Sequence, residues 1–427
     1  MDFIEQQLSQ TTRGKEARRI IDALSRAGFQ AVLAGGCVRD GLLGRRPKDF
    51  DVATDATPDA VRRLFGHRST LAFGASFGVI GVLPSRADRR DESDTIEPTE
   101  VATFRADGEY LDGRRPDAVT FGDAQADAQR RDFTINGMFY DPQTSSVIDH
   151  VGGQQDLADR RLRTIGDPAA RFDEDKLRML RAVRFATILG FDLDAETAKA
   201  IRKHADSMSI VSGERIGAEM VRVLMHPRVV DGLSLLIDVN LHRCVWPHLD
   251  SASLPRIQQN LNRLDGWSFE VAMAVICDAV SGNNDAASEL ARKMARERLK
   301  AWRRSGAESR AVDAALRDAA FIAACCDLSW SQLQPRLIDR DCEVTLDVAV
   351  AIYGLTEGIQ RARRERERDP DSLNPQPLLT GDDLVSLGHR PNAHFKDWLT
   401  RARVLQLDGL ANTKTQVIEQ LNLPEPD

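Results

Sequence analysis

Residues 35–54, GGCVRDGLLGRRPKDFDVAT, decide how this chain is interpreted. They continue an apolar run, QAVLAGG at 30–36, which predicts a buried strand that ends at a glycine turn. Backbone N–H groups at Gly35 and Gly36, followed by the start of a helix, could hold a triphosphate. Arg39 would add a planar fork of donors for phosphate.

Two carboxylates, Asp49 and Asp51, follow one residue apart. Side chains two apart in a strand point to the same face, so we expect both carboxylates to converge on one point. Mg²⁺ is held in proteins by one or two carboxylates together with phosphates and water. The stretch therefore predicts a Mg²⁺-dependent nucleotide site built for phosphoryl transfer.

The composition is that of a water-soluble globular protein, with 427 residues, 42% hydrophobic and 29% charged. This length predicts two to three domains. We expect no membrane association, because no apolar run approaches the roughly 20 residues of a membrane-spanning helix. The N-terminus has no signal-peptide pattern, and the six cysteines have no zinc-binding spacing, so a reducing, cytoplasmic location is expected.

The net charge of −7 does not favour nucleic-acid binding, but a local basic face would be sufficient. Arginine is concentrated at 291–310 and 361–368. These stretches predict either an RNA-binding face or solvated helices with Glu–Arg pairs four residues apart.

The pattern along the chain predicts an α+β fold, with a small α/β head followed by helices. Strands are expected at 31–35, 77–83, 100–105 and 117–121, and strand signals cease at the glycine pair Gly152–Gly153. Residues 84–99 are charged and predict an exposed insertion, residues 105–117 are flexible in composition, and 369–377 reads as a linker. The expected domains are a head at 1–150, a neck at 151–225, a body at 226–368 and a tail at 369–427.

Two further clusters carry chemistry. In RRDFTIN at 130–136, Arg131 can bind phosphate and Asp132 can accept hydrogen bonds from ribose hydroxyls. In EDKLRMLRAVR at 174–184, helical spacing would place Asp175 beside Arg178. An acceptor next to a donor matches the pairing edge shared by cytosine and adenine, and would leave polar groups unpaired against uracil or guanine.

In their order and spacing these motifs resemble those of the class II tRNA nucleotidyltransferases and bacterial poly(A) polymerases, a branch of the DNA polymerase beta superfamily. The resemblance covers most of the chain, including PLLTGDDLVSLGHRP at 377–391. It implies a polymerase-beta-like head and a hinge at Gly152–Gly153. It also implies that residues 105–117 form a loop used in the switch to ATP, and that the body and tail bind RNA.

The resemblance also implies roles for individual residues. The catalytic residues would be Asp49 and Asp51, which hold the metal, with Glu100 as a third carboxylate. Asp175 and Arg178 would be a protein template for CTP and ATP, and Arg181 and Arg184 would reach base or phosphate. The full set expected to bind nucleotide is Gly35, Gly36, Arg39, Arg131, Asp132, Asn136, Asp175, Arg178, Arg181 and Arg184.

Among the family's reactions, the sequence favours addition of CCA to the 3′ end of tRNA, with binding to its acceptor arm. The segment FGASFGVIGV at 73–82 favours a CCA-type enzyme over poly(A) polymerases, and the intact stretch 105–117 favours it over CC-only enzymes. An A-adding specialist and a poly(A) polymerase stay open as alternatives, as does a non-catalytic RNA-binding relative, which the intact Asp49 and Asp51 oppose. The sequence leaves the oligomeric state open.

Overall fold

The computed structural model describes most of the chain, and two segments singled out in the sequence fall largely in its gaps. Of the charged insertion 84–99, residues 85–96 lie outside the described residues, and of the stretch 105–117, residues 108–117 do. The described residues are 2–74, 77–84, 97–107, 119–282 and 287–424.

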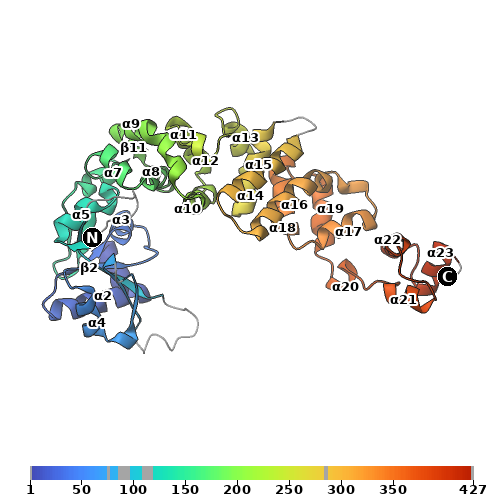
Figure 1. The fold of residues 1–427 in the computed structure, drawn as a ribbon, viewed down its shortest axis with the longest axis horizontal. Coiled ribbons are helices and arrows are strands. Elements are labelled where there is room, and N and C mark those ends of the chain that lie inside the picture. Colours follow the sequence, from blue (N-terminus) through green and yellow to red (C-terminus); the bar gives the residue numbers. More distant parts are fainter. Residues whose placement is uncertain (1, 75–76, 85–96, 108–118, 283–286, 425–427) are drawn as a thin grey trace. The chain divides into compact units, whose positions relative to one another are not determined.

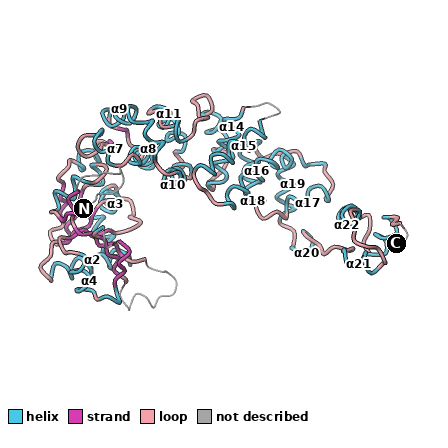
Figure 2. Tube along the Cα trace, in the orientation of Figure 1, coloured by secondary structure: helices cyan, strands magenta, loops and turns pink. Residues whose placement is uncertain are grey.

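The described chain forms two compact units. The first comprises residues 1–219 and 231–247, and the second comprises residues 220–230 and 248–427. All the strands belong to the first unit, as the magenta segments of Figure 2 show.

A seven-stranded mixed sheet forms the centre of the head, in the order β3-β4-β5-β2-β1-β8-β9. The pairs are antiparallel except β2 with β5, which run parallel. The parallel pairing matters for the site, because it brings the start of β2 and the start of β5 to the same edge. The strands are β1 (Ala31–Ala34), β2 (Asp51–Thr54), β3 (Thr70–Gly74), β4 (Val79–Val82), β5 (Thr99–Thr103), β8 (Met138–Asp141) and β9 (Ser146–Asp149).

Helices cover both faces of this sheet (Figure 1). Helices α2 and α4 pack against one face, and α5 contributes Ala124 and Ala128 to a core on the other, with Val32, Phe104 and Phe139. A small antiparallel pair, β6 with β7, lies beside α5. The elements are α1 (Asp2–Gln10), α2 (Thr12–Arg26), α3 (Gly36–Leu42), α4 (Pro58–Phe65), α5 (Ala124–Arg130), β6 (Arg105–Asp107) and β7 (Val119–Phe121), with short 3₁₀ turns at His67–Ser69 and Thr134–Asn136.

The glycine pair after β9 makes a tight turn into α6. The carboxylate of Asp149 accepts the backbone N–H groups of residues 151–154 at 2.9–3.0 Å. Gly152 has a φ of +79°, and a Cβ on Gly153 would lie 2.3 Å from the carbonyl oxygen of Thr134. Glycine is therefore required at both positions by local geometry. Hinge motion at this turn stays a prediction.

Beyond this turn the first unit is almost entirely helical, apart from the short parallel pair β10 with β11. The elements are α6 (Gly153–Ala158), β10 (Arg161–Leu162), α7 (Pro168–Glu174), α8 (Leu177–Leu189), β11 (Asp192–Leu193), α9 (Ala195–His204), a 3₁₀ turn (Ala205–Ile210), α10 (Gly213–Leu224, which continues into the second unit), α11 (Val229–Asp238) and α12 (His242–Val245).

The second unit is helical throughout its described residues. Its last three helices enclose a small core of their own around Leu384, Ala402 and Val417. The elements are α13 (Leu254–Leu261), α14 (Phe269–Ser281), α15 (Ala287–Ala301), α16 (Gly306–Ala323), a 3₁₀ turn (Cys325–Asp327), α17 (Trp330–Leu337), α18 (Cys342–Tyr353), α19 (Glu357–Arg366), α20 (Pro370–Leu373), α21 (Gly381–Ser386), α22 (His394–Leu407) and α23 (Lys414–Leu421).

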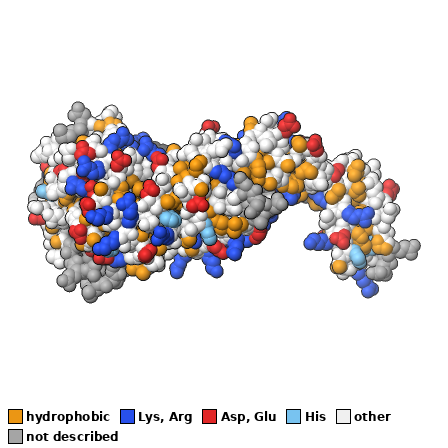
Figure 3. Space-filling view, turned by 90° about the horizontal axis from the view of Figure 1, so that it is seen from above, with side chains coloured by type: hydrophobic (Ala, Val, Ile, Leu, Met, Phe, Trp, Pro, Cys, Tyr) orange, Lys and Arg blue, Asp and Glu red, His pale blue; other side chains and the backbone are white. Residues whose placement is uncertain are grey.

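Many arginines of the second unit are paired with acidic side chains. In the stretch 291–310, Arg292 and Arg296 both contact Asp313 and Glu289, and in 361–368, Arg368 pairs with Glu365. The face drawn in Figure 3 likewise shows basic and acidic side chains interspersed. These contacts favour the solvated ion-pair interpretation for these arginines.

The predicted fold class is confirmed, because a mixed-sheet head precedes helices. The predicted strands at 31–35, 77–83, 100–105 and 117–121 correspond to β1, β4, β5 and β7, whereas β3, β6, β8, β9, β10 and β11 were not anticipated. The predicted linker 369–377 contains the one-turn helix α20. Among the described residues, no helix combines the length and the apolarity needed to cross a membrane.

Candidate active site

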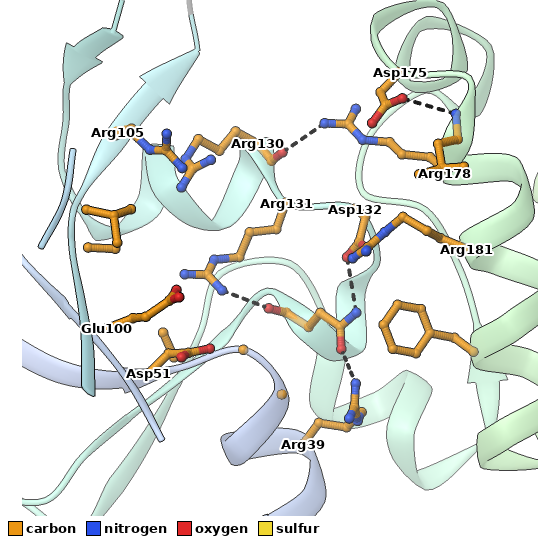
Figure 4. Close-up of a pocket in the computed structure, with 18 of the residues that line it drawn as sticks. Arg39, Asp51, Glu100, Arg105, Arg130, Arg131, Asp132, Asp175, Arg178 and Arg181 are labelled. Carbon is orange, nitrogen blue, oxygen red and sulfur yellow. Dashed lines mark hydrogen bonds and ion pairs between the residues drawn. The ribbon is translucent and has the colours of Figure 1, made fainter. Parts of the chain in front are cut away.

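A cavity of about 570 Å³ lies within the first unit, between the edge of the head sheet and helices α8 and α10. Figure 4 shows side chains of β2, β5 and α3 approaching it from the head, opposite those that precede or belong to α8. Of the residues singled out in the sequence, only Asp49 and Arg184 do not line it. Those that do are Gly35, Gly36, Arg39, Asp51, Glu100, Arg131, Asp132, Asn136, Asp175, Arg178 and Arg181.

The glycine pair forms the floor of the cavity where β1 passes into α3. Gly35 has φ +71° and ψ −125°, a conformation that side chains disfavour, and its N–H donates to the carbonyl oxygen of Met138. A Cβ on Gly35 would lie 2.9 Å from Nη1 of Arg131. The predicted strand–glycine–helix arrangement is therefore present, with an arginine directly above the turn.

Asn136 connects the glycine turn to the opposite wall. Its Oδ1 accepts Nη1 of Arg39 at 2.7 Å, and its Nδ2 donates to Oδ1 of Asp132 at 3.1 Å (Figure 4). Arg39 is 9% exposed and also donates to Asp40. These hydrogen bonds hold the guanidinium of Arg39 in place, although Arg39 and Asn136 are 97 residues apart in the sequence.

Asp132 is more strongly engaged than the sequence suggested. Its Oδ2 accepts Nε and Nη2 of Arg181 at 3.0 and 2.5 Å, and its Oδ1 accepts the Phe133 N–H and Asn136. Burial would raise the pKa of Asp132, but the charge of Arg181 and these hydrogen bonds lower the pKa to about 2. A carboxylate offers about four acceptor positions, so a ribose hydroxyl could bond to Asp132 only by replacing one of these donors.

The guanidinium of Arg131 is held next to the glycine turn by the carboxylate of Asp127. Its Nε and Nη2 donate to Oδ2 of Asp127 at 3.0 and 2.9 Å, and its guanidinium lies 5.1 Å from the ring centroid of Phe139. Asp127 is 1% exposed and is also paired with Arg130. The buried Asp127 therefore holds two adjacent arginines of the cavity wall.

Asp51 and Glu100 lie together at the sheet edge. The parallel pairing of β2 with β5 places Val52 opposite Val101, so the residues before them are neighbours. Burial and the negative charges of Glu100 and Asp49 raise the pKa of Asp51 to about 6. The placement expected for Glu100 agrees with the structure.

Asp49 departs from the expected arrangement. The strand begins only at Asp51, so Asp49 lies outside β2, although the two aspartates do line one cavity. The carboxylate of Asp49 contacts Nη1 of Arg13 at 3.3 Å and lines a separate cavity of about 290 Å³. Asp51 and Glu100 line both cavities, so Asp49 approaches them from the second one.

The donor set fits a hard divalent cation. Carboxylate oxygens are the ligands that Mg²⁺ prefers, and Asp51, whose pKa is raised by burial and by the charges of Glu100 and Asp49, would be stabilised as a carboxylate by a bound cation. Within the described residues, however, no group of three or more acidic, histidine or cysteine side chains is already arranged around one point. Asp49, Asp51 and Glu100 nevertheless line the smaller cavity together.

The segment 174–184 is not one helix. Helix α7 ends at Glu174, Asp175 has extended backbone angles (φ −147°, ψ 104°), and α8 begins at Leu177. Asp175 therefore does not share a helical face with Arg178, which corrects the spacing argument made from the sequence. Its Oδ1 instead accepts the Leu177 N–H at 3.1 Å, as a helix-capping aspartate does.

The partners of this motif also differ from the expected pair. Asp175 accepts Nη2 of Arg215 at 2.8 and 3.1 Å, whereas Arg178 donates to Glu174 at 2.5 Å. Both Asp175 and Arg178 still line the cavity. An acceptor and a donor are thus held there by different neighbours.

Helix α8 presents two arginines in different ways. Arg181 faces the cavity and pairs with Asp132. Arg184 is 7% exposed, pairs with Glu219 of α10 and does not line the cavity, so the structure does not bring it to the expected nucleotide site. The guanidinium carbons of Arg39, Arg181 and Arg184 lie 5.3, 5.4 and 3.8 Å from the ring centroid of Phe185.

Sequence reasoning missed several residues that shape the site: Arg13, Asp127, Glu174, Phe185 and Arg215. One signal was available, because an aspartate two residues before an apolar periodic run is a typical helix start. It would have placed a boundary at Asp175. No local signal connects Arg215 or Arg13 to its partner, since each pair is more than 30 residues apart in the sequence.

Comparisons with known proteins agree with this architecture. A family model described as the poly A polymerase head domain matches residues 31–163, and one described as the probable RNA and SrmB-binding site of polymerase A matches residues 190–253. The fold and the cavity thus define a protein with a poly A polymerase head. A CCA-adding enzyme from Levilactobacillus brevis is 30% identical over 378 residues, which cover 88% of this chain and 89% of that relative. The chain belongs to the CCA-adding enzyme family, as the sequence motifs predicted.

Two other relatives define the extent of the likeness. A CCA-adding enzyme from Bacillus pumilus is 43% identical over 224 residues, which are 52% of this chain and 53% of that protein, so the chain spans about half the length of such relatives. The crystal structure of the Bacillus stearothermophilus CCA-adding enzyme in complex with CTP has a TM-score of 0.75 and 28% identity, covering 95% of this chain and 97% of that one.

Proposed function

We propose that this protein adds CCA to the 3′ ends of tRNA, using CTP and ATP, without a nucleic-acid template. The observation that carries the proposal is that one cavity contains the carboxylates Asp51 and Glu100 together with Asp175 and Arg178. The first pair suits nucleotidyl transfer, and the second suits selection of a base edge. Family membership and the CTP complex of the Bacillus stearothermophilus relative support it.

In this proposal the arginines bind the triphosphate. The guanidinium of Arg131 lies next to Gly35 and that of Arg39 next to Gly36, so both meet phosphate oxygens beside the N-terminus of α3. Asp175 accepts the exocyclic amine of cytosine or adenine, and Arg178 donates to the ring nitrogen beside it. Asp132 and Asn136 position Arg181 and Arg39 around the ribose.

Mg²⁺ held by Asp49, Asp51 and Glu100 would supply charge neutralisation at the α-phosphate and the pyrophosphate, and would lower the pKa of the attacking 3′-hydroxyl. The carboxylates carry the essential role, so Asp51→Asn should remove transfer while leaving tRNA binding in place. Residues of the helical neck, body and tail would contact the acceptor arm through phosphates and shape rather than base sequence. We infer a cytoplasmic location, which the six free cysteines support.

The experiment uses two tRNA transcripts, one ending at the discriminator base and one ending in CC. Each is incubated with enzyme, Mg²⁺, and CTP and ATP singly or together, and the products are sized on a sequencing gel. Three nucleotides added to the first and one to the second establish CCA addition. A single A on the CC-ended tRNA alone would identify an A-adding specialist, and long A ladders a poly(A) polymerase. No addition by wild-type enzyme that still binds tRNA would favour a non-catalytic relative.

A further inference from the structure

Arg13 contacts one carboxylate of the proposed metal site. It lies in the first turn of α2, where Thr11 caps the helix by accepting the Gly14 N–H at 3.0 Å. A Cβ on Gly14 would lie 2.2 Å from the carbonyl oxygen of Gln7, so α1 and α2 meet closely there. These contacts fix the position of the Arg13 backbone near the start of β2.

The guanidinium of Arg13 is held by three acceptors. Nη1 donates to the carbonyl oxygen of Lys48 at 2.7 Å and to Oδ1 of Asp49 at 3.3 Å, and Nη2 lies 3.5 Å from Glu97. All of these residues line the 290 Å³ cavity that shares Asp51 and Glu100 with the larger one. The bond to the Lys48 carbonyl anchors the cation independently of Asp49.

A cation at Asp51 would compete with Arg13 for Asp49. Arg13 contacts Oδ1 of Asp49, and its positive charge at this carboxylate opposes the binding of a second cation there. Asp49, Asp51 and Glu100 line the same smaller cavity, so the three carboxylates lie close enough to share one cation. The guanidinium therefore partly neutralises Asp49, the carboxylate that would join Asp51 and Glu100 around a cation.

We propose that Arg13 is a positioning residue that holds Asp49 in an ion pair when no metal is bound and releases it when the metal binds. The ion pair sets the metal concentration at which Asp49 joins Asp51. This inference rests on the proposed function, because it assumes that Asp51 holds a divalent cation.

The test is Mn²⁺ binding to the whole protein without nucleotide, measured as free Mn²⁺ by electron paramagnetic resonance. Replacing Arg13 by Gln (R13Q) should tighten Mn²⁺ binding about two- to five-fold, the range expected when a partly exposed ion pair no longer competes. The matched control is K15Q, which removes the same charge from the next exposed basic position of α2. K15Q should bind Mn²⁺ as the wild type does.

A second pair of variants isolates Asp49. In a D49N background, R13Q should change Mn²⁺ affinity by less than about 1.5-fold, because the competing carboxylate is gone. Unchanged or weaker Mn²⁺ binding by R13Q in the Asp49 background would overturn the inference while leaving the proposed function intact. Wild-type protein that binds no Mn²⁺ at these carboxylates would overturn both.

Discussion

Arg215 donates to both carboxylate oxygens of Asp175, with Nη2–O distances of 2.8 and 3.1 Å. The two residues come from α10 and from the break between α7 and α8, and both line the large cavity. The carboxylate proposed to read the base is thus oriented by an arginine 40 residues away. Selectivity for the base should depend on Arg215 as well as on Asp175 and Arg178.

Replacing Arg215 by Ala should reduce discrimination against the wrong base. The capping bond from Leu177 would hold only one oxygen of Asp175, so the acceptor would lose its fixed direction. We expect the ratio of kcat/KM for CTP to that for UTP to fall about ten-fold, or about 1.4 kcal/mol. Single-nucleotide incorporation into tRNA measures this ratio. Glu214→Gln, at the exposed neighbouring position, should leave it unchanged. An equal loss for both nucleotides would show that Arg215 supports stability rather than selection.

Replacing Gly35 by Ala should damage the phosphate site, whereas Gly36→Ala is its matched control. A Cβ on Gly35 would meet Arg131 at 2.9 Å in a positive-φ conformation, while one on Gly36 would meet only Arg39, at 3.8 Å. Strain of this kind costs about 1–3 kcal/mol. We therefore expect thermal unfolding of Gly35→Ala to begin several degrees earlier and kcat to fall at least ten-fold. The two variants behaving alike would argue against this view of the turn.

Replacing Asp132 by Asn should destabilise the protein in a pH-dependent way. The pKa of Asp132 is lowered from its ordinary value of 3.8 to about 2, so its stabilising effect is present above pH 4 and is lost as the pH falls through 2. The variant should lose about 2 kcal/mol of unfolding free energy at pH 7, with a smaller difference from wild type below pH 4. Urea unfolding between pH 3 and 8 measures it. A difference that grows on acidification would contradict the ion pair with Arg181.

Replacing Phe185 by Leu should loosen the arginines of the cavity. The ring is 9% exposed and contacts three guanidinium groups, and each cation–π contact contributes about 0.5–2 kcal/mol. We expect KM for CTP and ATP to rise about three- to ten-fold with kcat within two-fold of wild type. Phe172→Leu, a buried phenylalanine outside the cavity lining, tests for a general packing effect. If it raises KM equally, the cation–π explanation is wrong.

Much of the fold could be predicted from the sequence because its signals are local. The apolar run before Gly35 gives β1, and the periodic residues of 177–189 give α8. The strands β8 and β9 were missed because their sequences, MFYD and SVID, include polar residues, whereas β1 and β4, which are equally short, consist of apolar residues and glycine. The break at Asp175 was missed because residues with helical spacing lie on both sides of it. In the structure α7 ends at Glu174, and Asp175 accepts the N–H of Leu177, where α8 begins.

The sequence by itself determined the chemical groups of the site: the glycine turn, the carboxylates, the arginines and the family to which the chain belongs. Only the tertiary structure decided which groups are partners. Arg39 bonds to Asn136 across 97 residues, Asp175 takes Arg215 rather than Arg178, and Asp49 takes Arg13 rather than sharing a strand with Asp51. The physical reason is that hydrogen bonds and ion pairs act over a few ångströms between side chains. Which side chains come that close depends on how sheet and helices pack, not on their spacing along the chain.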